Sequence, residues 1–171
     1  MNIYAGIGSR TTPDDICEAM TKIAIYLAGH GWVLRSGHAD GADKAFERGA
    51  RFKEIFLPWH GFNGSKPGQL GHTVPDITER MTQIAKDFHP NWAACSSAAR
   101  KMHIRNVCQV LGADCVTPAK MVICWTPNGK GSGGTGQAIR IAKGFNIPVF
   151  DLALEKNQRE LCDFINQKEA A

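Results

Sequence analysis

Three short glycine-bearing segments constrain this chain more than any other feature of its sequence. They are Gly6–Arg10, Ser36–Asp43 and Gly129–Gly136, and each follows an apolar run and precedes a helical pattern. Where a strand ends and a helix begins, the first amide groups of the helix lack partners and carry partial positive charge. Glycine lets such a turn come close to an anion, because it has no Cβ. The three segments therefore predict a crevice that binds phosphate.

The polar residues that accompany these glycines support this interpretation. A single glycine turn after a strand is often a tight connection and nothing more. In this chain, hydroxyl or guanidinium side chains accompany all three turns; they are Ser9, Arg10, Ser36, Ser132 and Thr135. Their recurrence at successive strand ends indicates a nucleotide or another phosphorylated small molecule as the ligand.

Apolar runs alternate with amphipathic ones along the chain, which is typical of βα repeats and a parallel sheet. The expected strands cover about 3–7, 32–35, 54–57, 121–125 and 147–150. The expected helices cover about 13–28, 42–51, 76–87, 92–111, 138–143 and 155–167. We therefore expect an α/β protein with a three-layer Rossmann-like fold and a central, mostly parallel sheet of about five strands.

The periodic pattern dissolves in a long loop at about 58–75, which is rich in glycine and contains Trp59, His60 and Phe62. A connection of this length often serves as a binding loop. Its planar side chains suit a flap that stacks on a base. A mobile surface excursion is the alternative interpretation.

Length and composition bound the remaining possibilities. The 171 residues fit one domain, 1–171, and the net charge of +4 favours anionic ligands without requiring nucleic acid. No apolar run reaches the roughly 18 residues of a membrane span, so we expect no transmembrane helix and no membrane partner. The chain begins with a strand pattern instead of a signal sequence, which indicates a cytoplasmic location.

The cysteines and histidines show no pattern typical of a metal site. Six cysteines are scattered without a CxxC pair, which suits a reducing compartment. The six histidines pair neither with one another nor with cysteines at ligand spacing, and His89 with Cys95 matches no recognised site. We therefore predict no metal and no cofactor. His38 is the exception of interest, because it lies inside the second glycine segment and could contact a phosphate or shuttle a proton.

Three motifs of this sequence resemble those of a known superfamily. Ser36–Asp43 resembles the S-G-x-A-x-G-x-D segment of the DprA/Smf group, and Arg105-Asn106 is similar to the R-N pair of that group. The turn Gly131–Thr135, ahead of an apolar helix, is similar to the third-loop motif of the wider SLOG superfamily. That superfamily also includes the LOG cytokinin-activating hydrolases and molybdenum-cofactor carrier proteins. The resemblance extends from Ile3 to about Phe150.

The resemblance implies a Rossmann-like sheet whose strand ends bind a nucleotide or the phosphate of a nucleic acid. Arg10 and Arg105 are then the expected phosphate clamps, because a guanidinium presents a bidentate fork. The positions that the resemblance and the glycine pattern together assign to ligand or phosphate binding are Gly8, Ser9, Arg10, Ser36, Gly37, His38, Gly41, Asp43, Arg105, Asn106, Gly131, Ser132, Gly133, Gly134 and Thr135.

Asp43 has two interpretations. It could accept a hydrogen bond from a ribose hydroxyl or orient an amide of a glycine loop. It could also serve only the start of its own helix, where negative charge is favourable, and this structural role is the preferred one.

The third loop departs from the pattern of the LOG hydrolases. They resemble this chain there but carry G-G-x-G-T-x-x-E, whose glutamate takes part in cleaving the N-glycosidic bond. Arg140 falls at that position, or Ala138 if the turn is aligned on Thr135, and arginine cannot act as a general base at neutral pH. Candidate catalytic residues elsewhere are Asp43, Arg105 and His38, and Asp40 or Glu79 could also supply a carboxylate.

Three functions follow from these observations. A protein that binds or senses a nucleotide or a nucleotide-like phosphate ligand is the first interpretation. An N-glycosidase that acts on nucleotides is the leading alternative, and a DprA-like module that binds single-stranded DNA is a further one. DprA proteins are usually longer than this chain and carry extra small domains, so their recombinase-loading role does not transfer. Because members of the superfamily commonly pair through helices, we expect a homodimer or a higher homo-oligomer.

Overall fold

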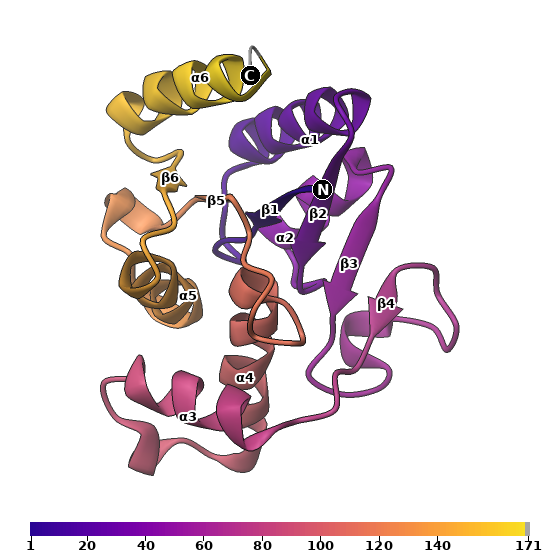
Figure 1. Cartoon of the computed structure of the whole chain (residues 1–171), viewed down its shortest axis with the longest axis vertical. Helices are drawn as coiled ribbons and strands as arrows, with labels where there is room; N and C mark the ends of the chain where they lie inside the picture. Colours follow the sequence, from indigo (N-terminus) through magenta and orange to yellow (C-terminus); the bar gives the residue numbers. More distant parts are fainter. Residues whose placement is uncertain (170–171) are drawn as a thin grey trace.

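A six-stranded parallel sheet forms the centre of the protein (Figure 1). The computed structural model describes residues 1–169; the predicted domain also includes residues 170 and 171, which lie outside the described part. In spatial order the strands are β4 (His72–Thr73), β3 (Lys53–Phe56), β2 (Trp32–Ser36), β1 (Asn2–Gly6), β5 (Met121–Cys124) and β6 (Val149–Asp151). Every neighbouring pair in this order is parallel.

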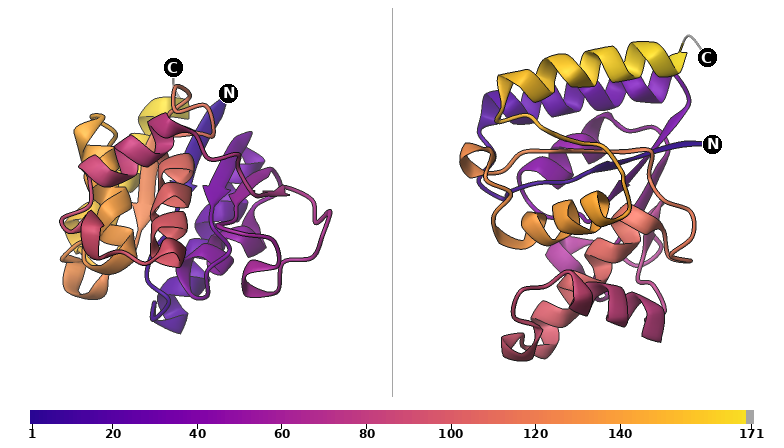
Figure 2. Two further views of the ribbon diagram at one scale, coloured as in Figure 1. Left: turned by 90° about the horizontal axis from the view of Figure 1, so that it is seen from below. Right: turned by 60° about the vertical axis from the view of Figure 1, so that its left-hand side comes forward.

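Helices cover both faces of the sheet (Figure 2). One layer consists of α1 (Asp14–Gly29), α2 (Ala42–Gly49) and α6 (Glu155–Glu169), and the other of α3 (Glu79–Asp87), α4 (Ser97–Leu111) and α5 (Gly133–Gly144). Each layer packs on the sheet through its own apolar core. The predicted three-layer Rossmann-like fold is confirmed.

Alternating side chains of β1 supply both cores. Ile3 and Ala5 belong to the core under α3, α4 and α5, whereas Tyr4 belongs to the core under α1 and α2. The ring of Tyr4 meets Trp32 and Phe46 edge-on, with ring centroids 6.4 and 6.1 Å away. Successive strand residues point to opposite faces, so a strand buried on both sides needs a continuous apolar run.

The sheet has one strand more than the sequence predicts. The 58–75 loop contains a 3-10 turn at Phe62–Gly64 and the short strand β4, whose His72 pairs with Ile55 of β3. Two residues are too few for an alternating pattern to be visible in the sequence. The expected count of about five strands is therefore corrected to six.

Three helix starts differ from the prediction, and the helix expected from about residue 76 begins at Glu79, capped by Thr78. The helix expected from residue 92 begins at Ser97, because the Ser96 hydroxyl caps it by accepting from the Ala99 amide at 3.2 Å. A separate 3-10 turn occupies Trp92–Ala94. The helix expected from residue 138 begins at Gly133, so the second half of the third glycine segment forms the first turn of α5 instead of a loop before it.

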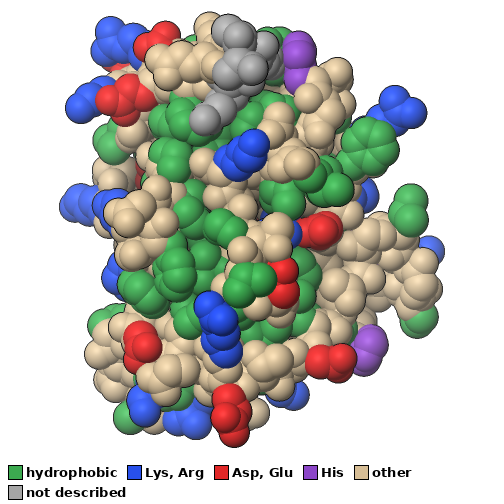
Figure 3. Space-filling model, viewed as in Figure 1, with side chains coloured by type: hydrophobic (Ala, Val, Ile, Leu, Met, Phe, Trp, Pro, Cys, Tyr) green, Lys and Arg blue, Asp and Glu red, His purple; other side chains and the backbone are tan. Residues whose placement is uncertain are grey.

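Hydrophobic side chains gather in the middle of the face seen in Figure 3, between α6 and α3, with a few charged side chains among them. Most Lys and Arg side chains lie toward the rim, where Asp and Glu are interleaved with them. This face therefore carries no continuous basic stripe. Within residues 1–169, every helix is too short or too polar to cross a bilayer.

Candidate functional site

The topology of the sheet leaves a crevice beside β1. From β1 the chain continues to β2 on one side, and β5 lies on the other side. Loops that leave such a switch point diverge, and open α/β sheets bind ligands there. A cavity of about 380 Å³ lies at this point, between the turn after β1, residues 7–10, and the start of α5, residues 132–135. We call this cavity the pocket.

The structure brings together most of the residues that the sequence assigns to ligand binding. Those that line the pocket are Gly8, Ser9, Arg10, Asp43, Arg105, Asn106, Ser132, Gly133, Gly134 and Thr135. Residues outside its lining are Ser36, Gly37, His38, Gly41 and Gly131. Met102, His103 and Gln109 of α4 also line it, and the sequence does not single them out.

The N-terminus of α5 is open toward the pocket. The Ser132 side chain makes no cap hydrogen bond, and the first turn carries no acidic residue. Gly133 adopts a positive φ of 67°, which favours glycine. The first amides of a helix have no partner within it, so this end of α5 presents uncompensated donors and partial positive charge. Such an end is suited to an anion.

The packing of the protein does not require a glycine at Gly134. A Cβ at Gly134 would meet no heavy atom within 4 Å, and its φ is not positive. At Gly8, by contrast, a Cβ would lie 2.6 Å from the Cβ of Ala42, so the close approach of α2 requires glycine there. Gly134 is exposed and is one of the residues that line the pocket. Glycine at this position keeps the end of α5 accessible.

Arg10 stands where two cavities meet. It is exposed and lines both the pocket and a neighbouring cavity of about 410 Å³ that also contains Trp59 and Phe62. Trp59 is 37% exposed and meets the ring of Phe62 edge-on. Within residues 1–169, the guanidinium of Arg10 has no hydrogen bond or ion pair. The predicted aromatic loop thus borders the site through Trp59, whereas His60 faces a different hollow.

Arg105 is engaged by the second glycine segment. Its Nη1 donates to the carbonyl of Gly37 at 2.6 Å and lies 3.7 Å from the Asp43 carboxylate. The side chain is buried, and its Nε finds no hydrogen-bond partner in the described part of the chain. Burial lowers the pKa of the guanidinium, and the negative charge of Asp43 acts in the opposite direction. Of the two predicted phosphate clamps, Arg10 is therefore the one with a free guanidinium.

Asp43 joins the first glycine segment to the second. Its carboxylate accepts from the amides of Gly8 at 3.2 Å and Ala39 at 3.4 Å. Burial raises the pKa of Asp43 to about 6, and the charge of Arg105 and the backbone amides act in the opposite direction. The Gly8 amide is thereby directed at Asp43. The geometry fits the predicted role of orienting a glycine-loop amide.

Side chains from three elements hold the third glycine segment. The Asn106 amide of α4 donates to the carbonyl of Gly134 at 3.1 Å. Behind it, the hydroxyl of Thr126 accepts from the Gly131 amide at 2.9 Å and itself hydrogen-bonds to Asp151. The sequence gives no signal for Thr126 and Asp151, because the two lie 25 residues apart in the chain and meet only through the fold.

Three predicted residues outside the lining support the turns that form it. Ser36 donates to the last carbonyl of β1 at 2.6 Å. A Cβ at Gly37 would lie 1.5 Å from the guanidinium of Arg105, so glycine is required there. A Cβ at Gly41, whose φ is 75°, would lie 2.4 Å from the carbonyl of Ser9. Ser36 and Gly41 thus keep the first and second glycine segments in contact, and Gly37 allows Arg105 of α4 to approach the second.

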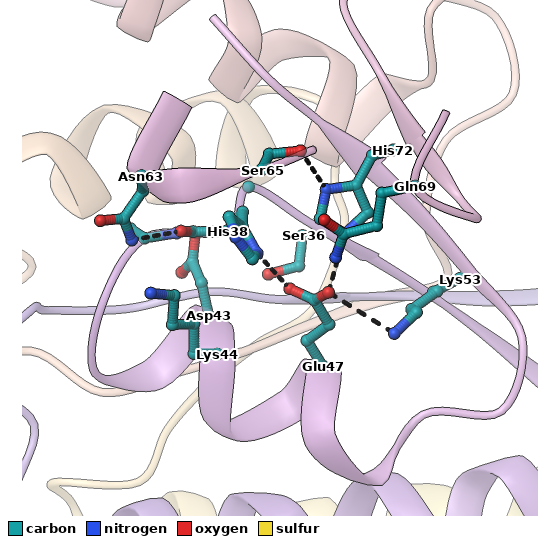
Figure 4. Close-up of polar contacts among 12 residues, drawn as sticks. Ser36, His38, Asp43, Lys44, Glu47, Lys53, Asn63, Ser65, Gln69 and His72 are labelled. Atoms are coloured by element: carbon teal, nitrogen blue, oxygen red, sulfur yellow. Dashed lines mark hydrogen bonds and ion pairs between the residues drawn. The ribbon is translucent and has the colours of Figure 1, made fainter. Parts of the chain in front are cut away.

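His38 lies outside the pocket lining and points toward Glu47 (Figure 4). Its Nδ1 lies 2.6 Å from one oxygen of Glu47, and Nε2 of His72 lies 2.8 Å from the other. Lys53 approaches the same carboxylate at 3.5 Å. Glu47, which the sequence does not single out, thus fastens the 58–75 loop and β4 to the second glycine segment.

The pocket wall offers one carboxylate among its lining residues, Asp43, and that group is buried and already bonded. Arg140, at the position of the hydrolase glutamate, donates to the carbonyl of Phe88 at 2.8 Å outside this lining. Asp40 pairs with Lys44 at 2.8 Å beside the second cavity. The lining residues of the pocket thus offer groups that can bind an anion, whereas their one carboxylate is already bonded within the protein.

Comparison with known proteins points to a shared fold. No family model and no curated protein matches this chain. Among solved structures it is similar to DNA processing protein A from Helicobacter pylori, which was described for its mode of binding single-stranded DNA. The TM-score is 0.55 at 17% identity, and the match covers 95% of this chain and 72% of the other. The neighbour belongs to the DprA group that the sequence motifs resemble, and at this identity the likeness shows the fold alone.

Proposed function

We propose that this protein binds the phosphate of a nucleotide in the pocket, against the first turn of α5. The observation that carries the proposal is the open start of α5, where Gly134 leaves space that nothing in the protein fills. Arg10 supplies the positive charge across from it, because its guanidinium is exposed and unpaired within residues 1–169. Together they provide the donors that a phosphate needs.

The neighbouring cavity suits the base of the same ligand. It shares Arg10, Ala39 and Met102 with the pocket, so a ligand that leaves the pocket past Arg10 meets Trp59. A half-exposed indole ring is a surface on which a base stacks, whatever its identity. This arrangement supports a nucleotide over inorganic phosphate as the ligand.

A nucleotide panel tests the proposal. The purified chain is incubated with ribo- and deoxyribonucleotides, and thermal stabilisation and free base are measured in the same samples. We expect stabilisation without base release, because ligand binding to the folded state raises its melting temperature. Stabilisation by none of the nucleotides would overturn the proposal. Base release that disappears in Asp43→Asn would favour the N-glycosidase alternative instead.

Arg10→Ala is the first variant to test. We expect nucleotide binding, measured by calorimetry, to weaken by about 1.5 to 3 kcal/mol, the range for hydrogen bonds to charged groups. Arg159→Ala on α6 is the matched control, because its side chain is 73% exposed and pairs only at the surface with Glu155. Equal affinities of the two variants would exclude Arg10 as a phosphate clamp.

Binding of single-stranded DNA is the second candidate function, and the similarity to DNA processing protein A favours it. A strand would use the same two cavities, with successive phosphates passing Arg10. Titration of a short oligonucleotide at increasing salt separates the candidates. A strand that neutralises several phosphates loses affinity steeply as salt rises, with a slope of about −0.7 per phosphate contact. A mononucleotide that binds as tightly as the oligonucleotide would exclude this second function.

A further inference from the structure

We propose that His89, Cys95 and His103 form a zinc-binding site beside the pocket. His89 and Cys95 lie in the connection between α3 and α4, at the lower end of the molecule in Figure 1, and His103 lies on α4. One ligand atom from each side chain falls within 4.8 Å of the other two. The fold brings together three donors whose spacing in the sequence predicts no metal site.

The distances suit a tetrahedral ion. Sγ of Cys95 lies 3.6 Å from Nε2 and 3.7 Å from Nδ1 of His89. Sulfur and nitrogen ligands at ordinary Zn–S and Zn–N bond lengths are roughly 3.6 Å apart in a tetrahedron. The rings of His89 and His103 have centroids 4.3 Å apart. Because Sγ is almost equally far from the two ring nitrogens, the His89 ring has to turn so that one nitrogen faces an ion bound to Cys95.

The tautomer of His103 is set by Gln137. The Gln137 amide nitrogen donates to the carbonyl of Ala85 at 2.9 Å, so its oxygen faces Asn106 and Nδ1 of His103, at 3.1 and 3.0 Å. That oxygen can only accept, so Nδ1 carries the proton and Nε2 keeps its lone pair. Metal-binding histidines are oriented in this way, by donating the other ring N–H to an oxygen.

The donor set selects the class of metal. One thiolate and two imidazoles suit Zn²⁺, whereas Mg²⁺ and Ca²⁺ require oxygen ligands that this cluster lacks. Nδ1 of His89 accepts from the exposed Asn91 amide at 3.1 Å, and water can replace this bond if the ion takes Nδ1. Three protein ligands leave a fourth position for water, as in zinc sites that are not purely structural. His103 also lines the pocket, so the ion would lie at its edge.

The other cluster of metal-binding side chains does not suit a cation. His38, Glu47 and His72 also lie within reach of one ion, but each imidazole already donates to one oxygen of Glu47 (Figure 4). Lys53 adds a positive charge 3.5 Å from the same carboxylate. Protons and a lysine therefore satisfy that cluster, whereas Sγ of Cys95 has only weak contacts, all at 3.6 Å or more.

Titration of the chelator-treated full chain with Co²⁺ tests the proposal without any nucleotide. Cobalt takes the place of zinc and reports its ligands by absorption. We expect the visible bands of a tetrahedral ion and a near-ultraviolet thiolate-to-cobalt band, both removed by added Zn²⁺. Cys95→Ser should lose the thiolate band and weaken Co²⁺ binding by more than the roughly 10- to 100-fold cost of losing a partner of a ligand. Cys162→Ser, which alters an exposed thiol on α6, is the matched control and should keep the thiolate band and bind Co²⁺ as tightly as the wild type.

Cys95 is partly exposed in a connection, so its serine variant should fold, which circular dichroism verifies. His89→Gln provides a second variant and should weaken cobalt binding in the same way. The absence of tetrahedral bands in the wild type would overturn the proposal. Bands that survive in Cys95→Ser and vanish in Cys162→Ser would overturn it too. Because no nucleotide is present, a failure here is distinct from a failure of the proposed function.

Discussion

A substitution at Gly134 should weaken ligand binding without lowering the stability of the fold. Gly134→Ala adds a methyl group where the protein has no neighbour within 4 Å and φ is not positive. We expect the free energy of unfolding to stay unchanged or to rise by about 0.4 to 1 kcal/mol, because alanine reduces the entropy of the unfolded chain. Nucleotide affinity should fall about tenfold or more, since the methyl group occupies the proposed phosphate position. Chemical denaturation and calorimetry measure the two effects.

Gly29→Ala is the control for this substitution. Gly29 ends α1, also lacks a positive φ, and a Cβ there would likewise meet nothing within 4 Å, but it lies outside the pocket lining. It should show the stability effect without the loss of affinity. If both variants bind nucleotide equally well, the space in front of Gly134 is not the phosphate position.

Asp43 should make folding stability depend on pH. Burial raises its pKa from 3.8 to about 6, so the folded state retains a proton that the unfolded state has lost. Asp43 therefore favours folding most at and below about pH 4, and this contribution disappears as the pH rises to about 6. At 1.36 kcal/mol per pH unit, the change across this interval is roughly 3 kcal/mol.

The variant Asp43→Asn isolates this effect, because asparagine has no proton to lose. Denaturant unfolding of both proteins across this interval should show the wild type losing stability relative to the variant as the pH rises. Parallel stability profiles would mean that Asp43 keeps an ordinary pKa, held by Arg105 and the amides of Gly8 and Ala39.

At the scale of elements, α4 holds two of the glycine segments in place. Arg105 ties it to the second glycine segment and Asn106 to the third, at 2.6 and 3.1 Å. The sequence motifs assign this pair to ligand binding, and in the structure both side chains bond to carbonyls of the glycine segments. Contacts of this kind join residues far apart in the chain, so no local pattern reveals which atoms they use.

The 58–75 loop should loosen when Glu47 is changed. Burial raises the pKa of Glu47, but the hydrogen bonds from His38 and His72 outweigh it and lower the pKa overall. A carboxylate of this kind stabilises the fold above its unfolded pKa, and the contribution is lost as pH falls. In Glu47→Gln we expect faster hydrogen exchange at Leu57, whose amide bonds to Thr73 of β4.

Hydrogen exchange followed by mass spectrometry measures this change. Lys44→Ala is the control, because Lys44 lies on the same helix and its loss leaves Glu47 with both histidines, and Asp40 with its bond from Asn63 of the loop. Acidification of the wild type should produce the same local loosening as Glu47→Gln. Unchanged protection around β4 in the variant would show that other contacts hold the loop.

The elements that the sequence does not predict are those that depend on tertiary contacts or form against local propensity. Strands buried on both faces need continuous apolar runs, which predict β1 and β5, and shorter apolar runs predict β2 and β3. The strand β4 depends instead on His72 and its tertiary partners. The start of α5 was missed because glycine disfavours helices, and Gly133 and Gly134 form its first turn at the expense of propensity. The cluster of His89, Cys95 and His103 was missed for a related reason, since only the packing of the α3–α4 connection on α4 assembles it.

At the scale of the whole molecule, sheet order determines where the site lies. The turns after β1 and β5 diverge because β1 continues to β2 on one side and β5 lies on the other, and the pocket opens between them. Glycine segments at strand ends predict this edge of the sheet from the sequence alone. The second cavity, joined to the first at Arg10, requires the path of the 58–75 loop and follows only from the structure.

Backbone amide chemical shifts test the central claim most directly. The 18.6 kDa chain is suitable for such spectra, recorded with and without a nucleotide that stabilises it. We predict that the largest changes fall on the amides of Gly133, Gly134 and Thr135 and on the Nε–H of Arg10, because these donors would meet the phosphate. Saturation by the nucleotide with those signals unmoved, and with changes elsewhere, would contradict the account.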